Sequence, residues 1–186
     1  GEKHWFELQV IMQVHIHGEP AFGIGLITDI MSQKEQIASL EAINQMDIFV
    51  GILNKATIEK LAQQMLEELQ EDEHLFMMIL DMDNFKLIND NFGHPVGDYV
   101  LKQVSDLMKR CAPSGAKVGR IGGDEFVTLL VARDAKAFLD YADKLIHKVI
   151  GIQWQGQHVG ANCSIGVSEA LKGGWTYEKL YAVSDK

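Results

Sequence analysis

The sequence lacks a surplus of positive charge. Its 186 residues include 17 Lys and Arg against 26 Asp and Glu, which gives a formal net charge of −9. This balance argues against a nucleic-acid partner, because nucleic-acid-binding surfaces gather Lys and Arg against the phosphates. A phosphate-bearing substrate remains compatible with the charge if metal ions mediate its contact with the protein.

Cysteine is scarce, and long apolar runs are missing. Cys111 and Cys163 form no C-x-x-C pair, so we expect reduced thiols in the core of a cytoplasmic protein and no disulfide framework. No run of about 18 apolar residues occurs and no signal peptide is visible, so we expect no membrane contact from this segment. Both ends of the chain fall inside strand-like or helical patterns. We therefore expect a longer parent protein, for which an upstream membrane anchor stays open.

The first part of the chain predicts a small hairpin and a connecting helix. Residues 5–16 and 21–30 are rich in strand formers and are separated by the turn "HGEP". A lone hairpin is too small to be stable by itself. Residues 34–46 carry apolar side chains at helical spacing, and this helix is either a solvated linker or a coiled-coil dimer contact.

From Asp47 onward the pattern is that of a compact α/β domain. Hydrophobic residues make up 47% of the chain, so a sizeable core is possible and disorder is not expected. Apolar spacing predicts helices over 58–69, 96–108, 138–149 and 177–186, and strands over 75–80, 117–121, 125–131 and 158–168. The strand 75–80, "LFMMIL", has no polar residue, which predicts burial on both faces.

Acidic residues follow two of these strands. Asp81 comes directly after the buried strand, and the stretch "RIGGDEFVTLLV" places Asp124 and Glu125 side by side after two glycines. The turn could be an ordinary hairpin with a solvated acidic tip. The alternative is a cation site, because carboxylates from both strands would repel one another unless divalent ions sat among them. Gly122 and Gly123 would then provide positive φ for a tight turn and let phosphates approach the backbone.

These motifs resemble those of GGDEF domains, the bacterial diguanylate cyclases. "RIGGDEF" is similar to the family signature, and "DMDNFKLINDNFGHPVGDYVL" resembles the second hallmark of the family, Asp-x-Asp-x-Phe-Lys-x-x-Asn-Asp followed by Gly-His-x-x-Gly-Asp. "MDIFVGILNK" resembles the first segment of the family's domain, and "CSIGVS" resembles its late strand. The resemblance covers about residues 46–186. Two long motifs at the right separation make a chance match very improbable.

The resemblance implies a fold and an activity. The fold would be α/β (α+β), with a mixed, largely antiparallel sheet flanked by helices, similar to the palm of adenylyl cyclases and polymerases. The activity would be condensation of two GTP molecules into cyclic di-GMP with release of pyrophosphate. Each subunit of a homodimer would hold one GTP. The alternative is a GGDEF domain that no longer catalyses and acts as a GTP-binding or dimerising regulatory module.

The resemblance also implies a metal site and a catalytic group. The ion would be Mg²⁺, with Mn²⁺ as a possible substitute, and its ligands would be Asp81, the Met82 carbonyl, Asp124 and Glu125. Asp124 and Glu125 would also be the candidates for deprotonating the 3′-hydroxyl of GTP, and Lys86 would stabilise charge on the phosphates. Taken alone, Lys86 would be read as a surface lysine.

Substrate contacts are implied in the same way. They fall on Phe85, Asn89, His94, Asp98, Gly122 and Gly123. A carboxylate at Asp98 can accept from guanine N1 and N2, whereas adenine N1 would face it as a second acceptor. The competing interpretations are a helix-start acid for Asp98, a turn for Asn89 and Asp90, and a structural histidine for His94.

Three features depart from the family pattern. Phe49, Val50 and Lys55 stand where Leu, Thr and Arg are usual, and we expect the loss of the fork-shaped Arg to loosen a turn contact. The window 113–116, "PSGA", has neither charge of the family's Arg-x-x-Asp product-inhibition site, so we infer no feedback there. "VSDK" reaches only the start of the usual last helix, so we expect that part of the phosphate clamp is truncated.

The first 33 residues resemble the C-terminal end of a PAS domain, with "TDIMSQKEQ" similar to its usual exit. The domain assignment is therefore a PAS-like hairpin over 1–33, a linker helix over 34–46 and a GGDEF domain over 47–186. We interpret the protein as a cytoplasmic diguanylate cyclase behind a sensory module. The sequence does not identify the signal that this module would sense.

Overall fold

The computed structural model describes residues 5–14, 20–32, 34 and 45–185. Within it the chain divides into two compact units, residues 1–44 and 45–186. The linker helix expected over 34–46 lies almost wholly outside the described residues. None of the described helices is long and apolar enough to cross a membrane.

The first unit contains an antiparallel hairpin of β1 (Phe6–Val14) and β2 (Pro20–Asp29). Phe6 lies opposite Asp29, and Leu8 lies opposite Ile27. The two expected strands are confirmed, whereas the turn between them lies outside the described residues. Leu8 and Ile27 are 63% and 68% exposed, so this hairpin buries little apolar surface by itself.

The second unit is built around a six-stranded sheet in the order β10-β5-β7-β6-β4-β3. Among the described strands only β4 and β6 pair in parallel, and the other neighbours are antiparallel. The sheet is therefore mixed and largely antiparallel, as expected. The strands are β3 (Met46–Asp47), β4 (Ile52–Leu53), β5 (His74–Met82), β6 (Lys117–Arg120), β7 (Glu125–Ala132) and β10 (Cys163–Ala170).

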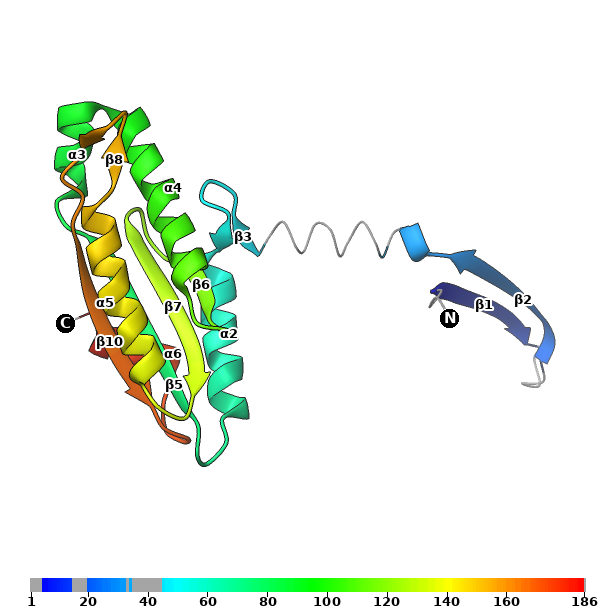
Figure 1. Cartoon of the computed structure of the whole chain (residues 1–186). Helices are drawn as coiled ribbons and strands as arrows, with labels where there is room; N and C mark the ends of the chain where they lie inside the picture. Colours follow the sequence, from blue (N-terminus) through cyan, green and yellow to red (C-terminus); the bar gives the residue numbers. More distant parts are fainter. Residues whose placement is uncertain (1–4, 15–19, 33, 35–44, 186) are drawn as a thin grey trace. The chain divides into compact units, whose positions relative to one another are not determined.

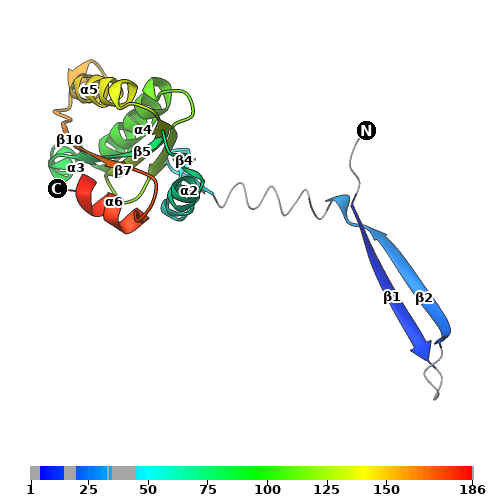
Figure 2. The same cartoon turned by 90° about the horizontal axis from the view of Figure 1, so that it is seen from below.

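Helices cover both faces of this sheet (Figures 1 and 2). One face packs against α4 and α5, and the other packs against α2 and α6. The four expected helices are confirmed, with somewhat different ends. The helices are α2 (Lys55–Glu68), α3 (Phe85–Phe92), α4 (His94–Cys111), α5 (Lys136–Ile150) and α6 (Tyr177–Ser184).

The apolar strand β5 is buried on both faces, as its sequence predicts. Met78 and Leu80 belong to the core formed with α4 and α5, whereas Met77 and Ile79 belong to the core formed with α2 and α6. All four side chains are at most 4% exposed. Since alternate residues of a strand point to opposite faces, a helical layer on each side requires this unbroken apolar run.

The short elements were not expected from the sequence. They are β3, β4, helix α3 and a two-stranded hairpin of β8 (Gln153–Trp154) and β9 (Gln157–His158). Helix α3 buries fully only Ile88, and it follows Asn84, whose φ is 53°. One buried residue gives no helical periodicity to detect. Asn89 and Asp90, for which a turn was one interpretation, lie inside this helix.

Both cysteines are free and partly buried, as expected. Burial raises the pKa of the Cys163 thiol to about 11. At neutral pH this thiol is therefore almost entirely protonated and unreactive.

Candidate active site

The site begins where β5 ends and β7 starts. Asp81 lies directly opposite Glu125 in the antiparallel pair, and the Met82 amide donates to the Asp124 carbonyl at 3.3 Å. The expectation that the glycine hairpin lies beside the buried strand is therefore confirmed. Three carboxylates, Asp81, Asp124 and Glu125, meet at one end of the sheet, and we call them the carboxylate corner.

The acidic side chains of the carboxylate corner repel one another. Partial burial, followed by repulsion from Asp124 and Asp83, raises the pKa of Asp81 above its ordinary value. Partial burial, followed by repulsion from Asp81 and Asp185, raises the pKa of Glu125. Acids whose mutual repulsion raises their pKa in this way are candidates for a functional site, because a bound cation would relieve the repulsion.

The glycine turn differs from the expectation in its backbone. Neither Gly122 nor Gly123 has a positive φ, so the expected primed turn is wrong. The bend is closed instead by the amides of Ile121 and Gly122, which both donate to the Glu125 carbonyl, at 3.0 and 3.4 Å. A Cβ at Gly122 would overlap the Glu125 carboxyl, whereas a Cβ at Gly123 would meet no atom within 4 Å. Gly122 therefore makes room for a site carboxylate, and Gly123 leaves the backbone open.

A second group of candidate residues lies where α3 meets α4. A Cβ at Gly97 would overlap Asn89 Oδ1 and would lie 3.1 Å from Phe85 Cζ. Glycine at this position thus lets the Asn89 side chain lie against α4. The contact falls at Gly97, the residue directly before Asp98. Asp98 is exposed and lies beyond the first turn of α4, which weakens its interpretation as a helix-start acid.

Lys86 and His94 are exposed near the same helix ends. Lys86 is the second residue of α3, and His94 is the first residue of α4, after Gly93 with its φ of 85°. Neither side chain forms an ion pair within the part of the chain that the structure describes. Both are therefore accessible to a ligand.

The donor groups of the carboxylate corner decide whether it fits a metal ion. Across the described ranges, no three Asp, Glu, His or Cys side chains are close enough together to hold an ion as they stand. The chemistry of Asp81, Asp124 and Glu125 nevertheless fits a hard divalent cation, since all three offer carboxylate oxygens. In Asp81 and Glu125, partial burial and then repulsion from acidic neighbours raise the pKa. Small side-chain rotations would have to complete the site around the ion.

The end of α6 also reaches the carboxylate corner, which the sequence did not reveal. A Cβ at Gly166 of β10 would overlap the Ser184 carbonyl, so glycine permits close packing of α6 on the sheet. Asp81, Ser164 and Asp185 share the lining of a cavity of about 330 Å³ at this place. No spacing rule connects residues so distant in sequence, and only the topology brings them together.

Two further polar residues were missed. Ser164 Oγ donates to Asp83 Oδ1 at 2.7 Å, which fixes the second acid of the "DMDNF" motif to β10. Arg120, two residues before Gly122, contacts the glycine turn itself through the Gly123 carbonyl. Its place beside the turn was the available signal, but a charged residue on a short strand also has an ordinary surface explanation.

Comparisons with known proteins agree with this geometry. The family model described as "Diguanylate cyclase, GGDEF domain" matches residues 44–186. The diguanylate cyclase DgcP of Pseudomonas aeruginosa is 30% identical over 143 residues, which cover 75% of this chain and 21% of that protein. The diguanylate cyclase DgcS of Shewanella oneidensis is 30% identical over 156 residues, covering 83% of this chain and 51% of that protein. The chain thus spans from about a fifth to about half of these relatives.

Solved structures show the same fold. The coiled coil and GGDEF domain of DgcB from Caulobacter crescentus, solved with c-di-GMP, matches with a TM-score of 0.76 at 20% identity, covering 84% of each chain. A sensory box/GGDEF family protein from Caulobacter crescentus matches with a TM-score of 0.67 at 27% identity, covering 76% of this chain and 93% of the other. The fold, the two motifs and the family match agree, and the chain belongs to the diguanylate cyclase family through the GGDEF domain at residues 44–186.

Proposed function

We propose that this domain condenses two GTP molecules into cyclic di-GMP with release of pyrophosphate. The observation that carries the proposal is the carboxylate corner, where Asp81 lies opposite Glu125 with Asp124 in the adjoining turn. The proposal is supported by relatives named diguanylate cyclases and by the second residue group at the α3–α4 junction.

Family membership implies dependence on a divalent metal ion, and the finer assignment is part of the proposal. The ion is Mg²⁺, with Mn²⁺ as a substitute, and its ligands are Asp81, the Met82 carbonyl, Asp124 and Glu125. When bound, it would neutralise charge on the phosphates of GTP. The chain's own contribution is to hold these oxygens at the bend and to accept the 3′-hydroxyl proton on Asp124 or Glu125.

Substrate recognition falls to the α3–α4 junction and the glycine turn. Asn89 and Asp98 read the guanine edge, and the exposed position of Asp98 leaves its carboxylate free to accept from N1 and N2. Lys86 meets the phosphates as a point charge. The complete set of proposed substrate contacts is Phe85, Lys86, Asn89, His94, Asp98, Gly122 and Gly123.

A single domain binds only one GTP, so the reaction needs a homodimer. Each 3′-hydroxyl would attack the α-phosphate held by the other subunit. The substrate GTP and the absence of a disulfide favour the cytoplasm as the place of reaction. Residues 1–33 are proposed to be the end of a PAS-like module, and the longer lengths of the relatives are in keeping with additional domains.

A non-catalytic regulator is the second candidate. It is favoured by the unusual Phe49, Val50 and Lys55 in the first segment of the domain. Such a module would bind GTP or dimerise without turnover. The carboxylate corner argues for the enzyme, because carboxylates placed close together lower stability, and such local costs are typical of functional sites.

The decisive experiment is to incubate the full-length protein with GTP and Mg²⁺ and to measure cyclic di-GMP and pyrophosphate. We expect one cyclic di-GMP and two pyrophosphates for every two GTP consumed. Binding of GTP without any product, at several protein concentrations that include the dimer, would favour the regulatory module.

A further inference from the structure

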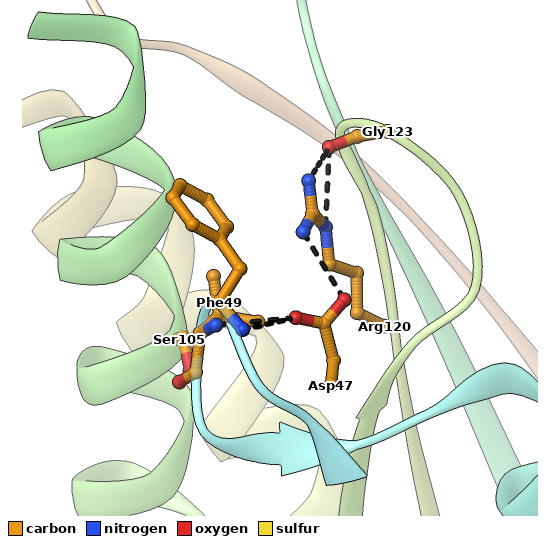
Figure 3. Close-up of polar contacts among 6 residues, drawn as sticks. Asp47, Phe49, Ser105, Arg120 and Gly123 are labelled. Carbon is orange, nitrogen blue, oxygen red and sulfur yellow. Dashed lines mark hydrogen bonds and ion pairs between the residues drawn. The ribbon is translucent and has the colours of Figure 1, made fainter. Parts of the chain in front are cut away.

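The first segment of the catalytic domain is tied to the glycine turn by one side chain. Figure 3 shows the Arg120 guanidinium between the Gly123 carbonyl and the Asp47 carboxylate. Arg120 Nε donates to the Gly123 carbonyl at 3.2 Å, and Nη2 donates to the same oxygen. Arg120 therefore contacts the backbone of the residue directly before Asp124.

The other end of the guanidinium is held by Asp47. Arg120 Nη1 lies 3.1 Å from Asp47 Oδ2, and the two side chains are only 14% and 23% exposed. The Coulomb attraction within an ion pair so shielded from water is screened less than on the open surface, and the planar fork of arginine fixes its direction. The turn thus cannot shift without breaking either this pair or the bonds to Gly123.

Asp47 is in turn fixed by its own loop. Its second oxygen accepts from the amides of Phe49 at 2.9 Å and Val50 at 3.2 Å. The buried Ser105 of α4 donates to the Val50 carbonyl at 2.8 Å and anchors the loop to the core. The loop 47–50 is therefore a rigid base for Arg120, although valine stands where the family usually has threonine.

Phe49 supplies a further contact that a leucine could not. Its ring centroid lies 5.2 Å from the Arg120 guanidinium carbon and 4.8 Å from Lys102 Nζ. The face of an aromatic ring attracts cations, with the strongest effect where water is partly excluded. The departure from the family pattern at this position has therefore added a holding contact for Arg120.

We propose that Arg120 is a positioning residue for Asp124, and that Phe49 and Asp47 hold Arg120 in place. We call Asp47, Phe49, Arg120 and Gly123 the latch. Because the latch joins the first loop of the domain to the turn before Asp124, the conformation of that loop sets the position of a catalytic carboxylate. The inference rests on the proposed function, and it assigns a means of regulating that same site.

Substitutions at Arg120 and Phe49 separate positioning from simple stability. The full-length protein is assayed for cyclic di-GMP formation, with kcat, KM for GTP and Tm measured for each variant. We expect Arg120→Gln to lower kcat about a hundredfold with KM changed less than about threefold, since small misplacements of catalytic groups have effects of this size. Arg120→Lys should recover only part of the loss, because an ammonium cannot span both partners.

The Phe49 variants form a matched pair. Phe49→Tyr keeps the aromatic face and should stay within about twofold of wild type, whereas Phe49→Leu keeps apolar bulk only and should lose about three- to fivefold in kcat. Lys102→Gln is the control, because it removes the other cation over the same ring without touching the turn. It should stay within about twofold of wild type.

The latch and the proposed function can fail separately. If the wild type makes product and Arg120→Gln retains its kcat, the latch is overturned. If the wild type makes no product, the proposed function fails, and hydrogen exchange of the amides at 121–125 then tests the latch. Faster exchange in Arg120→Gln than in Lys102→Gln would support the latch, and equal exchange in the two variants would overturn it.

Discussion

Two charged regions lie next to the glycine turn and are built in opposite ways. In the latch, Arg120 and Asp47 are oppositely charged, partly shielded from water and bonded to the backbone. In the carboxylate corner, Asp81 and Glu125 lie opposite one another with like charges, and partial burial followed by repulsion from acidic neighbours raises the pKa of each. The comparison shows that attraction and hydrogen bonds hold the turn in one region, whereas the other places like charges together at a cost in stability. Such a cost is in keeping with the proposed metal site.

The two regions should therefore respond differently to substitution. Removing a charge from the carboxylate corner removes a proposed metal ligand, so activity should fall. The same change relieves repulsion, so stability should hold or rise. Removing a bond from the loop that carries the latch leaves a polar group unsatisfied, so stability should fall before the chemistry is affected. The predictions below test this difference, in order of decreasing effect.

Asp124→Asn should abolish the activity that depends on the carboxylate corner without lowering stability. We expect cyclic di-GMP formation to fall about a thousandfold or more, because the substitution removes a proposed metal ligand and base. The Tm should be unchanged or higher, since Asp124 contributes to the repulsion around Asp81. Product formation and thermal melting are measured together, with Asp143→Asn, an exposed acid on α5, as the control. Turnover equal to that of wild type at saturating Mg²⁺ would falsify the proposed role.

Asp98→Ser should change base choice while leaving the carboxylate corner intact. The carboxylate accepts from guanine but would face an acceptor in adenine, and an acceptor that loses its water to a bound base without gaining a donor costs about 1–3 kcal/mol. The preference for GTP over ATP should therefore fall by about one to two orders of magnitude. Competition between the two nucleotides is measured in wild type and variant. A parallel loss of affinity for both, with an unchanged ratio, would mean that Asp98 does not read the base.

Mg²⁺ should stabilise the wild type through the carboxylate corner. At a Mg²⁺ concentration about ten times its dissociation constant, we expect the Tm to rise by about 2–5 °C. Asp81→Asn should remove most of this rise and should melt no lower than wild type without metal, because repulsion is relieved. The measurement is a melting curve at several Mg²⁺ concentrations. An undiminished rise in Asp81→Asn would exclude Asp81 as a ligand.

Ser105→Ala should weaken the loop that carries the latch. The variant leaves the Val50 carbonyl without its hydroxyl donor, so we expect a loss of about 1–2 kcal/mol in the free energy of unfolding. Denaturant unfolding measures this loss, and kcat well below the Tm should change less than about threefold. Ser114→Ala, at an exposed position, is the matched control. A loss of activity without a loss of stability would contradict the assignment of Ser105 to the scaffold.

The larger elements of the fold could be predicted from the sequence because each one buries a repeating apolar face. Strand β5 and helices α2, α4 and α5 all show this signal. Helix α3 and the two-residue strands do not, because they are fixed by tertiary contacts and by single residues such as Asn84 with its positive φ. Local patterns cannot reveal an element whose stability comes from its neighbours.

The site was predictable in its residues more than in its geometry. The motifs located Asp81, Asp124 and Glu125, and strand pairing confirmed that they meet. The predicted conformation of the turn was wrong, because neither glycine has a positive φ. Gly122 instead leaves room for the Glu125 carboxyl, and Gly123 leaves the space around its backbone open. The role of Arg120 could not be read from the sequence, since its partner Asp47 is 73 residues away along the chain.

The pairing of β5 with β10 has a kinetic consequence. Ser164 of β10 donates to Asp83, the residue directly after β5, and the two are 81 residues apart in sequence. Joining segments so distant requires closure of a long loop, and topologies rich in such pairings fold slowly. Both β10 and α6 border the carboxylate corner and come last in the chain. The nascent domain should therefore acquire both its second core layer and a competent site only when β10 and α6 dock.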